Sequence, residues 1–305
     1  MHLSEITPRS GATSNPVPSW MQGCFRRRSI SFANGQTDTD TRVFWLQSRS
    51  LTIDLRLPVV EQQVADGDDR QKQADYEGWY AHTLWDGSHL RWQGGTGYQL
   101  HNRWPEPAIL QRIGNCMLEF APSSAYVEDW RLLSGQPGPL IGLELVSETD
   151  LNTGTKSPRQ GALIICGQYA GLVLGRSSPV QHEGESLKQL LASPSLTEGE
   201  KRNLLAFEAS VAMGSLEEGF TVYHSLHLSR LQQPLTSLTG FEYAAKPGYL
   251  IQRTQDGERA VERLFRIDCH EREYPFLLST PASQESMEWF NREAPTLTRY
   301  TRIVE

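Results

Sequence analysis

The stretch TRVFWLQSRSLTIDLRLP, residues 41–58, decides the fold. β-Branched and aromatic residues fill two arms on either side of a polar turn at residues 48–50, a pattern typical of a β-hairpin. Because side chains alternate along a strand, each arm has one apolar face and one face that carries polar side chains. The side chains on this second face include Trp45, Gln47, Asp54 and Arg56. We therefore expect the hairpin to form one wall of a pocket.

The composition predicts a soluble, cytoplasmic protein. The chain has 305 residues, which is more than one domain usually contains. Of these residues 38% are hydrophobic, which is enough to form a core. Its net charge of −7 and the lack of a basic block larger than residues 26–28 argue against nucleic-acid binding. The N-terminus lacks a cationic segment followed by an apolar run, and no apolar run of about 18 residues occurs, so we expect neither secretion nor a membrane span.

Motifs for metal or cofactor chemistry are absent from the sequence. Cys24, Cys116, Cys166 and Cys269 are far apart and form no C-x-x-C, so we expect reduced thiols instead of a metal site. No P-loop, G-x-S-x-G or dinucleotide fingerprint follows a predicted strand. We therefore expect no metal and no cofactor.

Short β segments dominate the chain. Roughly sixteen of them recur at the spacing of sandwiches and barrels. One is YEGWYAHTLWDGSHLRW, residues 76–92, whose Asp-Gly turn predicts a second hairpin. The helical patterns are an amphipathic segment at 185–192 and a capping box at 197–200 that leads into 201–212. Residues 296–303 alternate as an edge strand would, so the chain is predicted to be all-β with few helices.

The two halves of the chain differ in composition. Seven of the eight tryptophans precede residue 131, and GQPGPLIG, residues 135–142, is a turn-rich joint. The number of strands is too high for one small barrel, so two sheets or barrels are expected side by side. We predict a flexible N-terminal arm at residues 1–17, a first β domain at 18–138 and a second β domain at 139–305.

Several segments together resemble a little-characterised group of bacterial and fungal lipocalin-like proteins. The similarity rests on WLQSRSLTIDLRLP, YEGWYA, HLRWQGGTGYQL, FAPSSAYVEDWRLLSG, GALIICGQYAGLVLGR and YPFLLSTPAS. In that group a W-x-Q strand, a D-x-R-x-P strand and a Y-x-E-x-W strand recur in the same order. The resemblance implies two lipocalin-like (calycin-type) antiparallel barrels or sandwiches, with one or two short helices in the second half. It also implies a ligand cavity and no particular reaction, and it extends to Trp45, Gln47, Asp54, Arg56, Tyr126, Glu128 and Trp130.

Two interpretations of the charged strand faces remain open. An Asp54–Arg56 pair, joined by Glu128, could close one end of a barrel, because buried charges must be paired. Alternatively, Arg56 could anchor an anion while Glu128 or Asp54 accepts a proton. In that case Trp45, Trp79 and Trp130 would form an apolar wall against which a ligand stacks.

Three functions follow from these interpretations. The leading hypothesis is binding of a small, partly apolar organic molecule in the N-terminal barrel. The binding residues would be Trp45, Gln47, Arg56, Trp79, Tyr126 and Trp130. The alternatives are a cofactor-independent isomerase, cyclase or hydratase that uses Glu128 and Asp54 as acid and base, and an interaction scaffold with filled barrels. The expected partners are a small organic ligand and, as an open option, a second copy of the chain in a homodimer.

Overall fold

The computed structural model describes residues 1–7, 9–10, 16–59, 62–66, 68–101, 106–181, 184–276 and 283–300. It confirms the all-β prediction. The first half forms a closed antiparallel barrel of eight strands, in which β10 pairs with β2 and closes the sheet. The barrel strands are β2 (Gly23–Phe32), β4 (Arg42–Gln47), β5 (Leu51–Leu57), β6 (Glu77–Trp85), β7 (His89–Gly97), β8 (Ala108–Ile113), β9 (Cys116–Phe120) and β10 (Tyr126–Leu132). A short strand, β3 (Thr37–Asp38), pairs with β2 outside this ring.

The hairpin that opens the sequence is the β4–β5 pair, in which Trp45 lies opposite Asp54. Side chains on its polar-bearing face point into the barrel, where Trp45 belongs to a buried cluster of lumen residues. Its apolar face points outward and is also buried. Strand alternation therefore places the predicted pocket wall inside the barrel, as the sequence pattern indicates.

The second half forms a ten-stranded sheet with the order β16-β15-β14-β13-β11-β19-β18-β17 and two short additions, β1 on β19 and β12 on β11. Phe220 of β16 and Phe241 of β17, at opposite ends of this order, belong to one buried cluster, so the sheet curls around its own core. The strands are β1 (Arg9–Ser10), β11 (Gly138–Asp150), β12 (Lys156–Ser157), β13 (Gly161–Cys166), β14 (Tyr169–Leu174), β15 (Glu208–Ser215), β16 (Gly219–Ser225), β17 (Phe241–Tyr243), β18 (Tyr249–Asp256) and β19 (Arg259–Tyr274).

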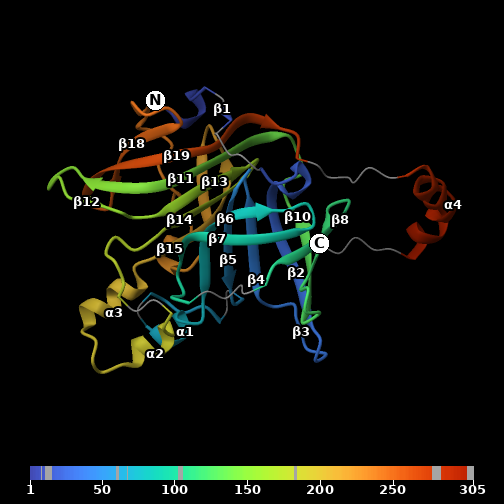
Figure 1. The fold of residues 1–305 in the computed structure, drawn as a ribbon, viewed down its shortest axis with the longest axis horizontal. Helices are drawn as coiled ribbons and strands as arrows, with labels where there is room; N and C mark the ends of the chain where they lie inside the picture. The colour runs from blue at the N-terminus through green and yellow to red at the C-terminus, as the bar shows by residue number, and fades with distance from the viewer. Residues whose placement is uncertain are drawn as a thin grey trace.

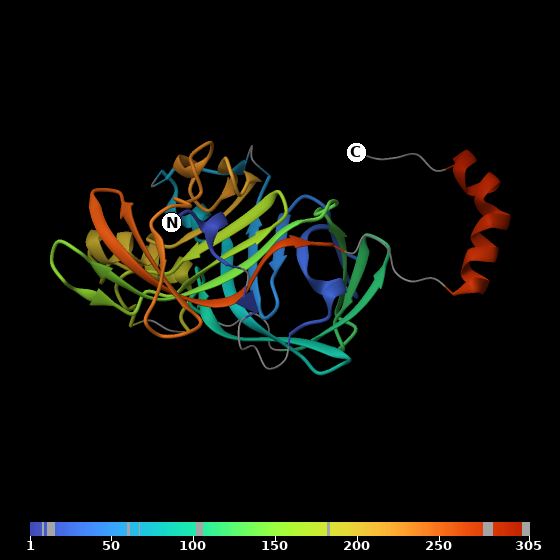
Figure 2. The same cartoon turned by 90° about the horizontal axis from the view of Figure 1, so that it is seen from above.

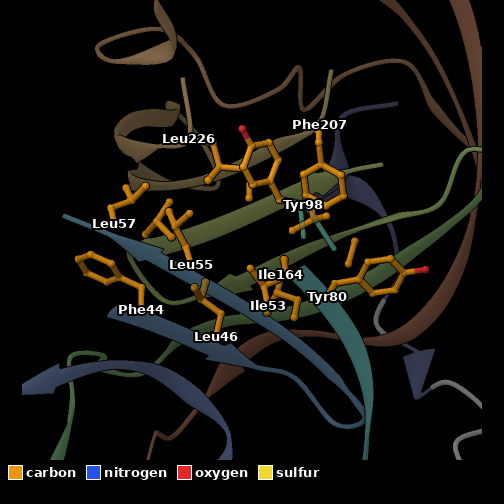
Figure 3. Packing of buried hydrophobic residues seen from close by; sticks show 14 of the residues in the cluster. Phe44, Leu46, Ile53, Leu55, Leu57, Tyr80, Tyr98, Ile164, Phe207 and Leu226 are labelled. Carbon is orange, nitrogen blue, oxygen red and sulfur yellow. The ribbon is translucent and has the colours of Figure 1, made fainter. Parts of the chain in front are cut away.

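The two sheets lie against each other (Figures 1 and 2), and buried side chains from both form one hydrophobic cluster between them. The outer faces of β4, β5 and β6 contact β13, β14 and β15. Figure 3 shows the side chains that fill this layer, with Leu46 and Ile53 from the hairpin close to Ile164 from the second sheet. Polar contacts flank this core: Ser48 Oγ donates to Asp268 Oδ2 at 2.7 Å, Arg49 Nη2 to Glu271 Oε1 at 2.9 Å, and His82 Nε2 lies 2.8 Å from Glu144 Oε1.

The helices in the described residues are α1 (Arg70–Gln73), α2 (Leu187–Ala192), α3 (Glu198–Leu205) and α4 (Gln284–Tyr300). The predicted capping box is present, because Thr197 and Glu200 exchange side chain to backbone hydrogen bonds. The predicted helix at 201–212 is too long. It ends at Leu205, and β15 begins at Glu208, because Ala209 and Val211 are buried in the core between the sheets.

The predicted edge strand at 296–303 is wrong, since residues 296–300 belong to α4 and 301–303 lie outside the described residues. Apolar residues at 287, 290, 294 and 297 have the spacing of a helix face. This helical pattern extends over more residues than the strand-like alternation at 296–303, and residues 284–300 form a helix. α4 lies apart from both sheets in Figures 1 and 2. Within the described residues, no helix combines the length and the apolar character needed to cross a membrane.

Residues 1–7 pack on the second sheet, although the sequence predicts a flexible arm there. Leu3 and Ile6 are fully buried, and the Leu3 amide donates to Leu238 O at 2.7 Å. Residues 8 and 11–15 of the predicted arm lie outside the described residues. The predicted joint at 135–142 coincides with the start of β11 at Gly138, where the chain passes from the barrel to the second sheet.

Candidate functional site

One end of the barrel lumen holds a cluster of buried charges. Arg27 Nη1 donates to Glu128 Oε1 at 2.7 Å, and Arg27 Nη2 donates to Asp38 Oδ2 at 3.1 Å. Arg56 Nε donates to Asp54 Oδ1 at 2.8 Å, and its Nη1 lies 3.9 Å from Glu128 Oε1. The predicted grouping of Asp54, Arg56 and Glu128 is therefore present, and Arg27 from β2 joins it. Mutual pairing satisfies the requirement that charges in a low-dielectric interior have partners.

A further carboxylate, Glu119 of β9, lies directly opposite Glu128 of β10 in the strand register. Both side chains are almost fully buried. Burial raises the pKa of Glu119 to about 8, and the charge of Glu128 adds to this shift. Tyr126 Oη donates to Glu119 Oε1 at 3.3 Å. This end of the lumen therefore keeps a proton on a carboxyl group near neutral pH.

The pKa of Asp54 is also raised, but by less than that of Glu119. Burial raises its pKa to about 6, against the lowering effect of Arg56. Burial lowers the pKa of Arg56, but the surrounding carboxylates outweigh it and raise that pKa overall. Chemically, the cluster can hold and release a proton within the barrel.

Aromatic side chains fill the middle of the lumen. The ring centroids of Trp45 and Trp130 are 5.6 Å apart at 74°, and those of Trp45 and Trp92 are 6.4 Å apart at 75°, both edge-to-face arrangements. Trp79 meets Trp92 in the same way at 5.8 Å. Trp45 and Trp130 are 2% and 1% exposed, so these two predicted ligand contacts belong to the packed interior.

Gln47, another predicted ligand contact, anchors a buried hydrogen-bond network. Its Oε1 accepts from Trp45 Nε1 at 3.2 Å, from Thr52 Oγ1 at 2.6 Å and from Thr83 Oγ1 at 3.0 Å. Its Nε2 donates to Ser48 O at 3.0 Å. The amide thus joins β4, β5 and β6 from inside the barrel, where an unsatisfied polar group would be costly.

A cavity of about 510 Å³ opens where the barrel faces the second half of the chain. β7 pairs with β8 only at His89 and Leu90, so its remaining length is held by β6 alone among the described strands. The run Gly94-Gly95-Thr96-Gly97 forms the C-terminal end of this strand, and a Cβ at Gly95 would lie 1.9 Å from Tyr80 O. Glycine is required for this close approach of β7 to β6, and both Gly95 and Tyr80 line the cavity.

Both halves of the chain contribute to this cavity. β6 and β7 contribute Glu77, Trp79, Tyr80 and Trp92, and the second half contributes loops at 158–160 and 175–180, including Arg176. Of the predicted site residues, Trp79 lines the cavity. The others do not line it and belong to the packed lumen or to the charge cluster: Trp45, Gln47, Asp54, Arg56, Tyr126, Glu128 and Trp130.

Sequence reasoning missed Glu119, Trp92 and Arg176. Glu119 could have been found from the segment CMLEF, because residues two positions apart in a strand share a face and Glu119 therefore lies on the same face as Met117. Trp92 lies on the same strand face as Leu90 for the same reason. No local signal marks Arg176, because its position depends on how the second half docks against the barrel.

A second cavity of about 630 Å³ lies in the second half, beside a cluster of arginines and acids. Arg263 Nε donates to Glu148 Oε2 at 2.9 Å, and Arg159 Nη1 donates to Asp256 Oδ2 at 2.9 Å. The guanidinium groups of this cluster are therefore neutralised by carboxylates. Over the described part of the chain, no group of three or more His, Cys, Asp or Glu side chains could hold a metal ion.

Comparison with known proteins gives no functional assignment. No protein-family model matches the chain, and no curated protein matches it. A solved structure, the uncharacterised protein YLR301w from Saccharomyces cerevisiae, aligns with a TM-score of 0.44 at 11% sequence identity. The alignment covers 81% of this chain and 98% of that one.

Proposed function

We propose that this protein binds a small, partly apolar organic molecule in the cavity between the barrel and the second sheet. The observation that carries the proposal is the 510 Å³ cavity, whose lining combines Trp79, Trp92 and Tyr80 with polar groups. Small-molecule sites have volumes of about 300–1,000 Å³. The lining of this cavity exposes more polar than apolar surface, which suits a ligand that is only partly apolar. The lumen itself is packed with tryptophan, so the ligand lies against the barrel wall instead of at its centre.

Trp92 and Trp79 give the cavity its apolar surface. Trp92 is only partly buried and lines the cavity, so part of its side chain remains accessible to a ligand. Its ring is held edge-to-face against Trp79 and Trp45, which fixes its orientation before a ligand arrives. A preorganised ring loses little conformational entropy on binding, which favours affinity.

Binding of N-phenyl-1-naphthylamine, a neutral fluorescent probe, tests this proposal. We expect its fluorescence to rise on binding and its affinity to fall at least tenfold in a Ser178→Trp variant. Ser178 lines the cavity and is exposed, so an indole there fills the cavity without entering the core. Ser177→Trp is the matched control, because Ser177 is exposed in the same loop and does not line the cavity. Equal affinity in both variants, or no binding by the parent protein, would refute the proposal.

A proton-transfer enzyme is the second candidate, and the raised pKa values of Glu119 and Asp54 favour it. Perturbed carboxyl groups at about 8 and 6 are suited to acid and base roles near neutral pH. The test is to recover a co-purified ligand by native mass spectrometry and incubate it with the parent protein, with Glu119→Gln and with Asp54→Asn. A change in the ligand that depends on Glu119 or Asp54 would support catalysis, and an unchanged ligand would support binding alone.

We also propose a cytoplasmic location. Cys24, Cys166 and Cys269 are free and buried, and Cys116 is free and partly buried, as expected in a reducing compartment. Cell fractionation with an antibody against the chain would test the location directly.

A further inference from the structure

Arg176 holds a positive charge at the cavity with no carboxylate partner among the described residues. Its Nε and Nη2 donate to Leu204 O at 2.8 and 2.6 Å, its Nη1 donates to Gly97 O at 3.0 Å, and its Nη2 also donates to Tyr98 O at 2.6 Å. All of these acceptors are neutral carbonyl groups. By contrast, Arg27 and Arg263, which are more deeply buried than the partly exposed Arg176, each face a carboxylate within 4 Å.

The guanidinium is fixed in place before any ligand binds. Its carbon lies 5.3 Å from the ring centroid of Phe207 and 5.9 Å from that of Tyr98, within the range of cation–π contacts. Burial lowers the pKa of Arg176 to about 10, so the group remains charged at neutral pH. Carbonyl groups and rings compensate only part of the cost of burying a charge, and an anion would compensate it further.

One donor of Arg176 remains for a ligand. A guanidinium has five N–H groups, and the four hydrogen bonds to carbonyl oxygens leave one N–H on Nη1. This geometry suits an anionic oxygen that accepts a single hydrogen bond. The cavity lining also contains the Glu77 carboxylate, which would repel a doubly charged group more strongly than a singly charged one.

We propose that the ligand of this cavity is an organic monoanion, with a ring or chain against Trp92 and an acidic group, carboxylate or sulfonate, on Arg176. This inference rests on the proposed function and names the chemical class of its ligand. Arg176 supplies the charge recognition, and the aromatic residues of β6 and β7 supply the apolar contact.

Two probes that share one ring system test the inference. 8-Anilinonaphthalene-1-sulfonate carries a single negative charge, and N-phenyl-1-naphthylamine is the same skeleton without the sulfonate. In Arg176→Gln we expect the dissociation constant of the sulfonate to rise at least tenfold and that of the neutral amine to stay within twofold. Arg176→Lys keeps the charge and should retain part of the preference for the sulfonate.

A measurement on the parent protein keeps the test valid if these variants fail to fold. 1-Naphthoate should displace bound N-phenyl-1-naphthylamine at a concentration at least tenfold lower than 1-naphthylmethanol, and at a lower concentration than 1-naphthyl phosphate. Equal potency of 1-naphthoate and 1-naphthylmethanol, or stronger competition by 1-naphthyl phosphate, would overturn the inference that the ligand is a monoanion. If the neutral probe binds and responds to Ser178→Trp while this preference is missing, the proposed function stands and the inference fails. If neither probe binds at the cavity, the proposed function fails as well.

Discussion

Glu119 of β9 and Glu128 of β10 lie directly opposite each other inside the barrel, both almost fully buried. Like charges at opposed positions of neighbouring strands destabilise a sheet, and burial increases this effect. The two residues differ in their partners. Glu128 Oε1 accepts from Arg27 at 2.7 Å, whereas Glu119 accepts from the neutral hydroxyl of Tyr126 at 3.3 Å. The proton therefore belongs on Glu119, which makes the stability of the barrel depend on pH.

Replacement of Glu119 by Gln should stabilise the protein at alkaline pH. The carboxyl has a pKa of about 8 in the folded state and an ordinary value of 4.5. Between these values the folded state holds a proton that the unfolded state has released, so the free energy of unfolding falls as pH rises and levels off above about 8. We expect Glu119→Gln to be more stable by about 1–3 kcal/mol at pH 9, with a smaller gain at pH 5.

Urea denaturation at pH 5, 7 and 9 measures this effect. Glu258→Gln is the control, since Glu258 is exposed in the β18–β19 turn and should follow the parent curve. A difference between Glu119→Gln and the parent protein that is the same at all three pH values would contradict the assignment of the proton.

Replacement of Glu128 by Gln should lower the free energy of unfolding, in contrast to Glu119→Gln. The change removes the more buried of the two carboxylates that pair with Arg27, whose side chain is 5% exposed. Removal of one partner of a buried ion pair costs about 3–5 kcal/mol, and relief of the repulsion on Glu119 should reduce the loss to about 2–3 kcal/mol. The double variant Glu119→Gln with Glu128→Gln should deviate from additivity, because the two groups interact. Additive effects in guanidinium denaturation would show that the two carboxyls are independent.

The turn of the opening hairpin should couple the unfolding of the two halves. Asp268 of β19 accepts from Ser48 Oγ at 2.7 Å, from the Ser50 amide at 3.0 Å and from Ser50 Oγ. Asp268→Asn removes the charge that strengthens these bonds and should lower the free energy of unfolding by about 1–3 kcal/mol. Because the two sheets share a core, we expect a single unfolding transition in both proteins.

Calorimetry and circular dichroism measure this coupling. Asp40→Asn is a suitable comparison, since Asp40 is exposed and its replacement should change stability by less than about 0.5 kcal/mol. Two separate transitions in the parent protein would mean that the halves unfold independently in spite of the shared core.

Among the tryptophans, Trp92 should matter for ligand binding and Trp45 should not. Trp92 lines the cavity and is partly exposed, whereas Trp45 is buried in the lumen and bonded to Gln47. Trp92→Leu should weaken binding of N-phenyl-1-naphthylamine about three- to tenfold, the value of one aromatic contact. Trp45→Phe should lower stability by about 1 kcal/mol through loss of its hydrogen bond, with binding within twofold of the parent protein. A larger loss of binding in Trp45→Phe would contradict this prediction and show that Trp45 contributes to the site, either directly or through its contact with Trp92.

Residues 41–58 illustrate what the sequence alone determined. Strand alternation assigned Trp45, Gln47, Asp54 and Arg56 to one face of a hairpin, and the structure places these side chains inside the barrel. Local patterns also predicted the capping box at Thr197, because a cap depends on residues three positions apart. These properties follow from side-chain periodicity and short-range hydrogen bonding.

Only the tertiary structure decided how these faces are used. The closure of β10 on β2 brings Glu128 to Arg27 over a separation of 101 residues. The docking of the second sheet on β4, β5 and β6 buries the outer face of the hairpin and places Arg176 at the cavity. Whether a strand face lines a packed lumen, an ion cluster or a cavity depends on the register and docking of distant strands. No periodicity within a segment records those contacts, and for that reason Arg176 has no signal in the sequence.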